Sequence, residues 1–193
     1  MTPGTNRVEA FSDGVLAIAI TLLVLEIGID PADYDDLWNA LLDEWPSYLA
    51  YVTSFLTIGA LWLAHHALLR RMVYADAVVV RINLLLLMAV AFIPFPTRLV
   101  AEAIDTTQAE RAAVLFYGAT LFTVSLLFTA MGRYVVSRRQ LVGEGRRLEL
   151  ESLNARLAPS LGFYSIILVL ALVAPSAAAF GFLAVALVAV IRA

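Results

Sequence analysis

Long apolar stretches dominate this chain, and short polar segments separate them from one another. An α-helix needs about 20 apolar residues to cross the hydrocarbon core of a bilayer. Stretches close to this length recur along the whole chain, and the pattern predicts six transmembrane helices. Their expected bounds are residues 8–29, 46–69, 78–100, 112–134, 157–174 and 176–191. Pro94 and Pro96 are expected to kink or end the third of these helices. The pattern therefore predicts an all-α membrane protein, with residues 1–193 forming one six-helix domain.

The composition supports a membrane protein and excludes several kinds of chemistry. Hydrophobic residues make up 62% of the chain and charged residues only 15%, and the mean hydropathy is +0.86. The absence of cysteine excludes disulfides, thiolate metal ligands and cysteine nucleophiles. The sequence contains no phosphate-binding loop, zinc-protease motif or nucleophile elbow. We therefore expect neither an enzyme nor a bound cofactor.

The positive charges predict how the helices are oriented. All thirteen basic residues are arginines; Arg98 and Arg111 belong to one side of the predicted topology, which leaves eleven for the other side. Cytoplasmic loops of membrane proteins are enriched in Lys and Arg. Both termini are therefore expected in the cytoplasm, as an even number of spans requires. Because aromatic residues do not alternate with these arginines, we expect no nucleic-acid partner.

Acidic residues gather on the opposite side of the predicted topology. Glu26 lies at the end of the first span, and Asp30 opens a loop that carries several further carboxylates. These charges suit a solvated loop that stays outside the membrane. They also suit an outer acidic vestibule, which would concentrate cations through its electric field. The two interpretations are compatible, and the sequence leaves both open.

Polar side chains occur at the start of the first span and near the end of the second. The segment Arg7-Val-Glu-Ala-Phe-Ser12-Asp13 leads into the first span and forms its first residues. Asp13 lies within the apolar run, so its carboxylate needs a partner, and Arg7 or a histidine of the second span is expected to supply it. The neighbouring His65 and His66 point about 100° apart on a helix, so we expect no metal bound by both.

The first span continues as an apolar stripe. Ile18, Leu22 and Leu25 follow the i, i+4, i+7 spacing that places residues on one helix face, and Thr21 borders this face. Such a stripe usually packs against other helices or lipid, and periodicity alone favours that interpretation. Hydrophobic constrictions also gate some channels by dewetting, so a pore-lining role stays open.

The run from Arg7 to Glu26 resembles the first helix of the transmembrane protein 175 family, which comprises potassium-selective channels of endolysosomes and their prokaryotic relatives. The segment Trp62-x-x-His65-His66 resembles the second helix of that family. The resemblance implies a prokaryotic-type chain of six helices that forms a homotetramer in the plasma membrane. The first helix of each copy would then line a central pore.

The resemblance also implies roles for individual residues. Ile18 would form the narrowest constriction, Leu22 and Leu25 would add apolar layers, and Thr21 would lie at or near the pore. The remaining polar residues would brace the pore helix rather than bind the ion. These bracing residues are Arg7, Ser12, Asp13 and a histidine of the second span, His65 or His66.

The sequence therefore predicts a passive potassium-selective channel with a hydrophobic filter and no cofactor. Its expected partners are further copies of the chain, monovalent cations and the lipid bilayer. The alternative is a proton-coupled or proton-conducting transporter that uses Asp13 with His65 or His66. A transporter of this kind would show saturable, pH-driven transport.

Overall fold

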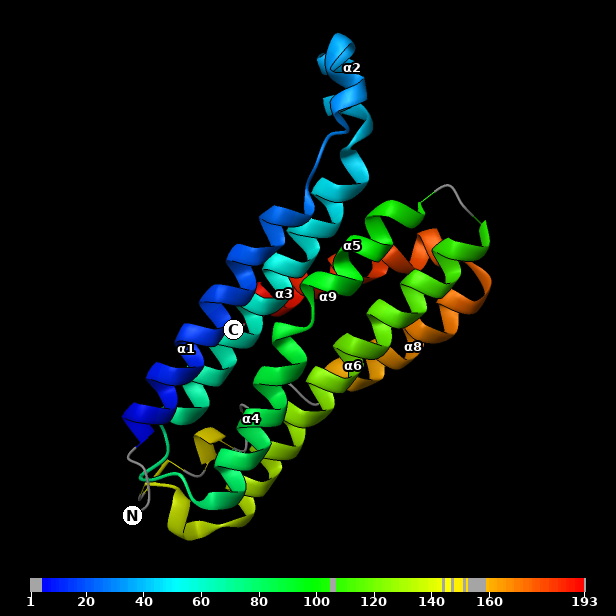
Figure 1. Ribbon diagram of the computed structural model, residues 1–193. Helices are drawn as coiled ribbons and strands as arrows, with labels where there is room; N and C mark the ends of the chain where they lie inside the picture. The colour runs from blue at the N-terminus through cyan, green and yellow to red at the C-terminus, as the bar shows by residue number, and fades with distance from the viewer. Residues whose placement is uncertain are drawn as a thin grey trace.

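In the computed structural model, helices pack lengthwise into a bundle (Figure 1). The structure describes residues 5–104, 107–143, 145–146, 148–150, 152 and 159–192. The first two residues of the fifth predicted span, 157 and 158, lie outside the described residues. The same holds for two arginines of the predicted cytoplasmic side, Arg147 and Arg156, and for the side chains of Arg139 and Arg192.

The helices follow the predicted apolar stretches to within a few residues. In chain order they are α1 (Thr5–Leu22), α2 (Leu37–Asp43), α3 (Trp45–Leu69), α4 (Ala77–Ala91), α5 (Pro94–Ala103), α6 (Thr107–Ser137), α8 (Pro159–Val173) and α9 (Pro175–Arg192). Short 3₁₀ helices extend or connect them: η1 (Leu23–Glu26), η2 (Pro31–Asp36) and η3 (Arg139–Leu141). The first span begins and ends three residues earlier than expected, at Thr5 and Glu26, and it ends there because the backbone becomes extended at Ile27.

The described part of the chain contains four helical spans whose length and composition suit a membrane crossing: Thr5–Glu26, Trp45–Leu69, Ala77–Ala103 and Gln108–Ser137. The two apolar helices that follow are shorter, with bounds Ser160–Val173 and Pro175–Ile191. The chain is therefore an all-α, multi-pass membrane protein. A count of six spans stays a prediction.

The third span is interrupted where the sequence predicts a kink. α4 ends at Ala91 and α5 begins at Pro94. Proline lacks an N–H and is tolerated in the first turn of a helix but not in its interior. Pro94 and Pro96 both lie in the first turn of α5, and Phe95 N donates to Phe92 O at 3.2 Å across the break. The kink predicted at these prolines is confirmed.

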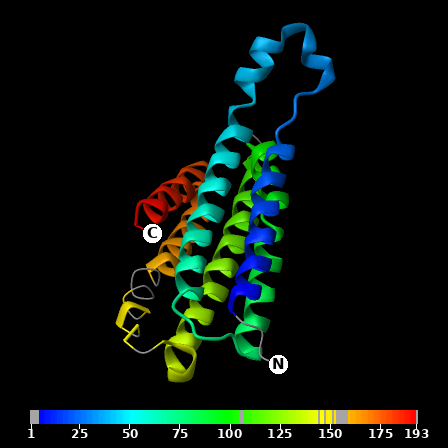
Figure 2. The ribbon, with the colours of Figure 1, turned by 90° about the vertical axis from the view of Figure 1, so that its left-hand side faces the viewer.

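The bundle has two ends, called lower and upper after their position in Figure 1. α1 begins and α3 ends at the lower end, whereas η2 and α2 extend beyond the upper end. Both views place the end of α9 at about mid-height (Figure 2), where α9 packs against α3. The cytoplasmic location of both termini stays a prediction.

The part of the chain that the structure describes covers only one face of α1. The buried residues of α1 and η1 recur every three or four positions, and they are Val8, Ser12, Leu16, Ala19 and Leu23. α1 packs against α3 and α4. This spacing is that of a single apolar helix face turned toward a core. The opposite face of α1 consequently points away from the rest of the chain.

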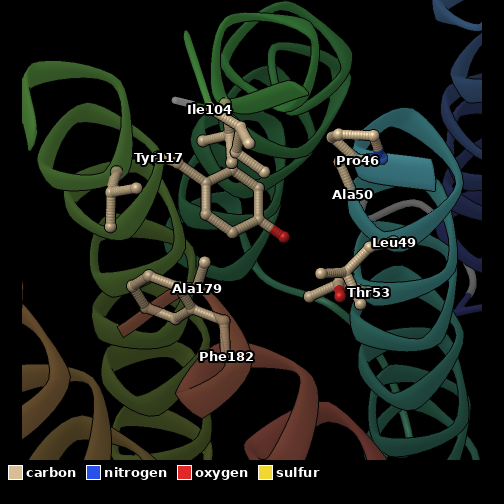
Figure 3. A pocket seen from close by; sticks show the side chains of 10 residues that line it. Pro46, Leu49, Ala50, Thr53, Ile104, Tyr117, Ala179 and Phe182 are labelled. Atoms are coloured by element: carbon tan, nitrogen blue, oxygen red, sulfur yellow. The ribbon is translucent and has the colours of Figure 1, made fainter. Parts of the chain in front are cut away.

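A small cavity lies between α3, α5, α6 and α9 in the upper half of the bundle (Figure 3). The ring of Tyr117 crosses it, and its hydroxyl points toward α3, where it lies 2.9 Å from Ser54 Oγ. Ser54 Oγ lies 2.8 Å from Thr97 Oγ1, so three buried hydroxyls form a chain. The cavity volume is about 20 Å³, which is room for about one water molecule. We interpret the cavity as a packing gap rather than a ligand site.

Candidate functional site

The uncovered face of α1 continues into η1 and is apolar along most of its length. The exposed fraction of the side chain is 61% for Ile18, 40% for Leu22 and 73% for Leu25. Thr21 lies on the same exposed face, and its hydroxyl donates to the backbone oxygen of Ile18 at 2.9 Å. Phe11, which is 55% exposed, continues this face toward the lower end. We call Ile18, Thr21, Leu22 and Leu25 the apolar stripe.

The apolar stripe contains no ionisable group. Between Asp13 and Glu26 the chain carries no charged residue. The one polar side chain in this stretch, Thr21, already donates to its own helix. A cation that passed along the stripe would therefore meet mainly methyl groups and few ligands to replace its hydration water.

A buried hydrogen-bond network holds the opposite face of α1. Asn83 Nδ2 in α4 donates to Ser12 Oγ at 2.9 Å, and His65 Nε2 in α3 lies 2.8 Å from Asn83 Oδ1. Because this amide oxygen can only accept, His65 Nε2 carries the proton. Ser12, His65 and Asn83 are 0%, 1% and 2% exposed. Buried polar groups are costly without partners, so the network fixes how α1 is rotated against α3 and α4.

A second set of polar contacts joins α1 to α3. Trp62 Nε1 donates to Asp13 Oδ1 at 2.8 Å. One helical turn away, His66 Nδ1 lies 2.7 Å from Glu9 Oε1. Among the described residues, His66 Nδ1 has no partner at both the distance and the angle of a hydrogen bond. Its distance to Glu9 is short enough, so the angle of this contact is unfavourable. The rings of Trp62 and His66 stack with their centroids 5.8 Å apart.

The residues predicted to form one polar network therefore fall into separate groups. Ser12 and His65 belong to the buried network, whereas Asp13 and His66 belong to the second set of contacts. Arg7 belongs to neither, because its side chain is exposed and forms no hydrogen bond or ion pair with another described residue. Asp13 accepts a hydrogen bond from Trp62 rather than from Arg7 or a histidine, and the bracing role expected of these residues stays a prediction.

Sequence reasoning missed the side chains that complete these contacts, namely Asn83, Trp62 and Glu9. An amide within an otherwise apolar span was a usable signal for Asn83, because such a group needs a partner in the membrane. Trp62 formed part of a recognisable segment, but nothing in its spacing showed that its indole N–H meets Asp13. Glu9 carried no distinguishing signal beyond its charge.

The acidic residues at the upper end surround an open hollow of about 560 Å³. Glu26 and Asp30 line it together with Arg98 and Glu102. Arg98 Nε donates to Glu102 Oε1 at 2.6 Å and lies 4.0 Å from Glu26 Oε2. Asp30 Oδ1 accepts from Ala32 N at 2.8 Å and so caps η2. Within the described residues, no three His, Asp or Glu side chains are placed to hold a metal ion.

Together, the fold and this site define a class of protein: a multi-pass helical membrane protein whose first helix is braced on one face and uncovered on the other. A family model described as the endosomal/lysosomal potassium channel TMEM175 matches residues 7–94. A solved structure, of a homolog of the lysosomal potassium-selective channel TMEM175 from Chamaesiphon minutus, is 34% identical. It has a TM-score of 0.88, and the match covers 97% of each chain. The chain belongs to the TMEM175 family.

Curated relatives of this chain are named as channels. A potassium channel from Streptomyces collinus is 45% identical over 128 residues, which cover 66% of this chain and 62% of the relative. A potassium channel from Chamaesiphon minutus is 38% identical over 164 residues, which cover 83% of this chain and 80% of the relative. The endosomal/lysosomal proton channel TMEM175 of Gallus gallus is 36% identical over 140 residues. That match covers 65% of this chain and only 28% of the Gallus gallus protein.

Proposed function

We propose that this protein is a passive potassium-selective channel of the plasma membrane, in which α1 from four copies of the chain surrounds a central pore. The observation that carries the proposal is the apolar stripe, which is uncovered while the other face of α1 is held by buried hydrogen bonds. One helix face cannot enclose a pore, whereas identical faces related by rotational symmetry can. The potassium-channel names of the relatives support the same function.

The proposed filter selects ions by the cost of removing their hydration water. Ile18 forms the narrowest ring, and Leu22 and Leu25 add further apolar layers toward the upper end. These rings provide no oxygen ligands, so an ion must pass them partly dehydrated. Potassium loses hydration water more readily than sodium, and a moderate preference for potassium follows. A ring of backbone carbonyls would select more sharply.

In the proposed arrangement each chain contributes one six-helix domain, and its lower end faces the cytoplasm together with both termini. The hollow that contains Glu26 and Asp30 then faces the outside. Its carboxylates raise the local concentration of cations, although Arg98 offsets part of their charge. The channel uses no cofactor and catalyses no reaction, and potassium is its permeant ion.

Ion flux into proteoliposomes tests the function directly. We expect potassium and caesium to enter vesicles that contain the purified protein, and sodium to enter more slowly. The mass of the detergent-solubilised complex, measured by light scattering, is expected to correspond to four chains. Vesicles that contain folded protein but show no cation flux would contradict a channel function.

A pair of matched substitutions tests the position of the pore. Ile18→Asn places an amide on the apolar stripe, and we expect it to raise conductance or reduce selectivity because the constriction becomes wettable. Ile166→Asn in α8 is the control, since Ile166 is exposed to a similar degree (66% against 61%) but lies on another helix. We expect Ile166→Asn to leave potassium selectivity unchanged. Equal effects of the two substitutions on flux are inconsistent with a pore at Ile18.

Proton conduction is a second candidate function, supported by one feature of the site and by one relative. Ionisable groups of α1 and α3 lie close together in the lower half of the bundle, namely Glu9 and Asp13 of α1 and His66 of α3. The relative from Gallus gallus is named a proton channel. The apolar stripe has no ionisable group, so protons would have to cross it through water. His65 is less suited to a relay, because it is buried and bonded to Asn83.

A further inference from the structure

At the lower end, two segments that are distant in the sequence lie side by side. Met72, which follows α3, pairs with Val142, which follows η3, in an antiparallel β-bridge. Val73 N donates to Leu141 O at 2.9 Å within this bridge. The connection between α3 and α4 is therefore held in a fixed position against the segment that follows α6.

The bridge brings three arginines together. Arg146 Nη1 donates to the backbone oxygen of Arg70 at 2.8 Å, and Arg71 Nη1 donates to the backbone oxygen of Ala67 at 2.7 Å. These bonds use only part of the five donors of each guanidinium. Arg71 also pairs with Glu149, whose Oε2 lies 3.3 Å from Arg71 Nε. Among the described residues of this segment pair, three positive charges thus stand against one negative charge, and the guanidiniums of Arg71 and Arg146 are oriented by backbone oxygens.

Two large apolar side chains are exposed beside these arginines. Val73 is 61% exposed and Leu148 is 77% exposed. A Cβ atom at Gly143 would lie 3.5 Å from Arg146 Cδ and 3.9 Å from Val73 Cγ2, so these two side chains flank the same glycine. Leu148 is next to Glu149, the partner of Arg71. We call Arg70, Arg71, Val73, Arg146 and Leu148 the lower arginine surface.

The lower arginine surface begins where membrane spans end. The span of α3 ends at Leu69, directly before Arg70, and the span of α6 ends at Ser137, a few residues before the bridge. Residues at such positions lie at the depth of the lipid headgroups. Guanidinium groups bind phosphate oxygens through paired hydrogen bonds, and exposed aliphatic side chains insert at the boundary between headgroups and acyl chains. Charge and apolar surface together therefore suit a phospholipid rather than a soluble anion.

We propose that the lower arginine surface binds the headgroup of an anionic phospholipid, with its phosphate on Arg70 and Arg146 and with Val73 and Leu148 inserted beside it. This inference does not depend on whether the chain conducts potassium. Arginines that act only in orienting the helices need charge but no particular arrangement. A lipid site also needs an oriented guanidinium, here that of Arg146, and the adjacent apolar side chains, and the two roles are therefore distinguishable.

Titration of the purified full-length chain with phosphatidylglycerol and phosphatidylcholine, followed by native mass spectrometry, tests the proposal. We expect the wild-type protein to bind phosphatidylglycerol several-fold more tightly than phosphatidylcholine. The double substitution Arg70→Gln and Arg146→Gln is expected to abolish this preference. Arg98→Gln with Arg111→Gln is the matched control, because it removes the same charge at the upper end, and it is expected to keep the preference.

A third variant separates the apolar contribution from the charge. Leu148→Ser leaves the net charge unchanged and is expected to weaken phosphatidylglycerol binding, since an inserted side chain is lost. If the double variant at Arg70 and Arg146 does not fold, Arg70→Gln alone replaces it, because only the backbone oxygen of Arg70 takes part in the bond to Arg146. No preference in the wild-type protein, equal losses in both double variants, or full displacement of the lipid by inorganic phosphate would each overturn the proposal.

Discussion

Asn83 is the residue on which three helices depend, because its amide contacts Ser12 of α1 and His65 of α3 at once. Each partner uses a different atom of the amide, so no shorter side chain can replace both contacts. Asp13 has a simpler environment, with one hydrogen bond from Trp62. These two residues therefore allow the brace of α1 to be tested in different ways.

Replacing Asn83 with alanine leaves the buried His65 Nε2–H without its acceptor. An unsatisfied buried donor is costly, and we expect the free energy of unfolding to fall by about 1–3 kcal/mol. Thr123→Ala is the control, because the exposed Thr123 hydroxyl only donates to Ala119 O of its own helix; its effect is expected to stay within about 0.5 kcal/mol. Chemical unfolding in detergent measures both. Similar losses in the two variants are inconsistent with a network that joins helices.

Substitutions of Asp13 distinguish a positioning role from a proton relay. Asp13→Asn retains an oxygen that can accept from Trp62 Nε1, whereas Asp13→Ala removes the acceptor. If Asp13 positions α1, we expect Asp13→Asn to keep most of the potassium flux and Asp13→Ala to reduce it. If Asp13 relays protons, both substitutions abolish proton uptake, because neither side chain can exchange a proton. Parallel potassium-flux and proton-uptake assays in liposomes separate the two outcomes.

At the scale of the element, α4 begins with a well-defined cap outside the predicted spans. Asp76 Oδ1 accepts from Val78 N at 3.1 Å and from Val79 N at 2.9 Å, and Tyr134 OH of α6 donates to Asp76 Oδ2 at 2.8 Å. Burial on its own raises the pKa of Asp76. The hydrogen bonds and the nearby charge of Arg138 outweigh it, and the pKa lies below its usual range.

A lowered pKa in the folded state makes the charged form of Asp76 stabilising. This contribution is fully present above the pKa of the unfolded chain, which is about 4, and is lost as the pH falls through the lower folded value. We expect Asp76→Ala to lower stability at pH 7 by about 0.5–2 kcal/mol, and the variant to lose less stability than the wild type on acidification. Melting temperatures between about pH 7 and pH 3 test this, with Asp30→Ala, the cap of the exposed η2, as the control. If the stability of Asp76→Ala falls on acidification as much as that of the wild type, the Asp76 cap is not the source of the pH dependence.

The elements were more predictable from the sequence than their contacts. Apolar length predicted the helix bounds closely, and Pro94 and Pro96 predicted the break between α4 and α5. The i, i+4, i+7 spacing also placed Ile18, Leu22 and Leu25 on one face. The partner of Asp13 and the bridge at Met72 were not predictable. Such contacts depend on how helices and loops are shifted and rotated against each other, and the periodicity of a single segment does not contain that information.

At the scale of the whole molecule, the packing of α8 and α9 against α6 depends on a close approach at Gly118. A Cβ atom there would lie 2.7 Å from Phe182 Cζ and 2.8 Å from Leu168 Cδ2. Phe182 is only 1% exposed and packs edge-on against the ring of Tyr117, with the centroids 5.3 Å apart. Its ring has little room to move away from an added methyl group.

We therefore expect Gly118→Ala to lower the free energy of unfolding by about 1–3 kcal/mol through overpacking. Gly162→Ala in α8 is the matched control, because a Cβ at Gly162 meets nothing within 4 Å. This control is expected to be neutral or slightly stabilising, since alanine favours a helix more than glycine does. Thermal unfolding of both variants in detergent gives the comparison. A Gly118→Ala protein as stable as the control would show that Phe182 and Leu168 can move without cost.

The two faces of α1 also differ in how freely their residues can change. Ser12, Leu16 and Ala19 have almost no exposed surface, so substitutions there disturb the packing of the chain itself. Ile18 and Leu25 are mostly exposed, and substitutions there change few contacts within the chain. If the apolar stripe is the filter, ion preference can diverge between related proteins while each chain still folds. Selectivity and foldability are then properties that evolution can adjust separately on a single helix.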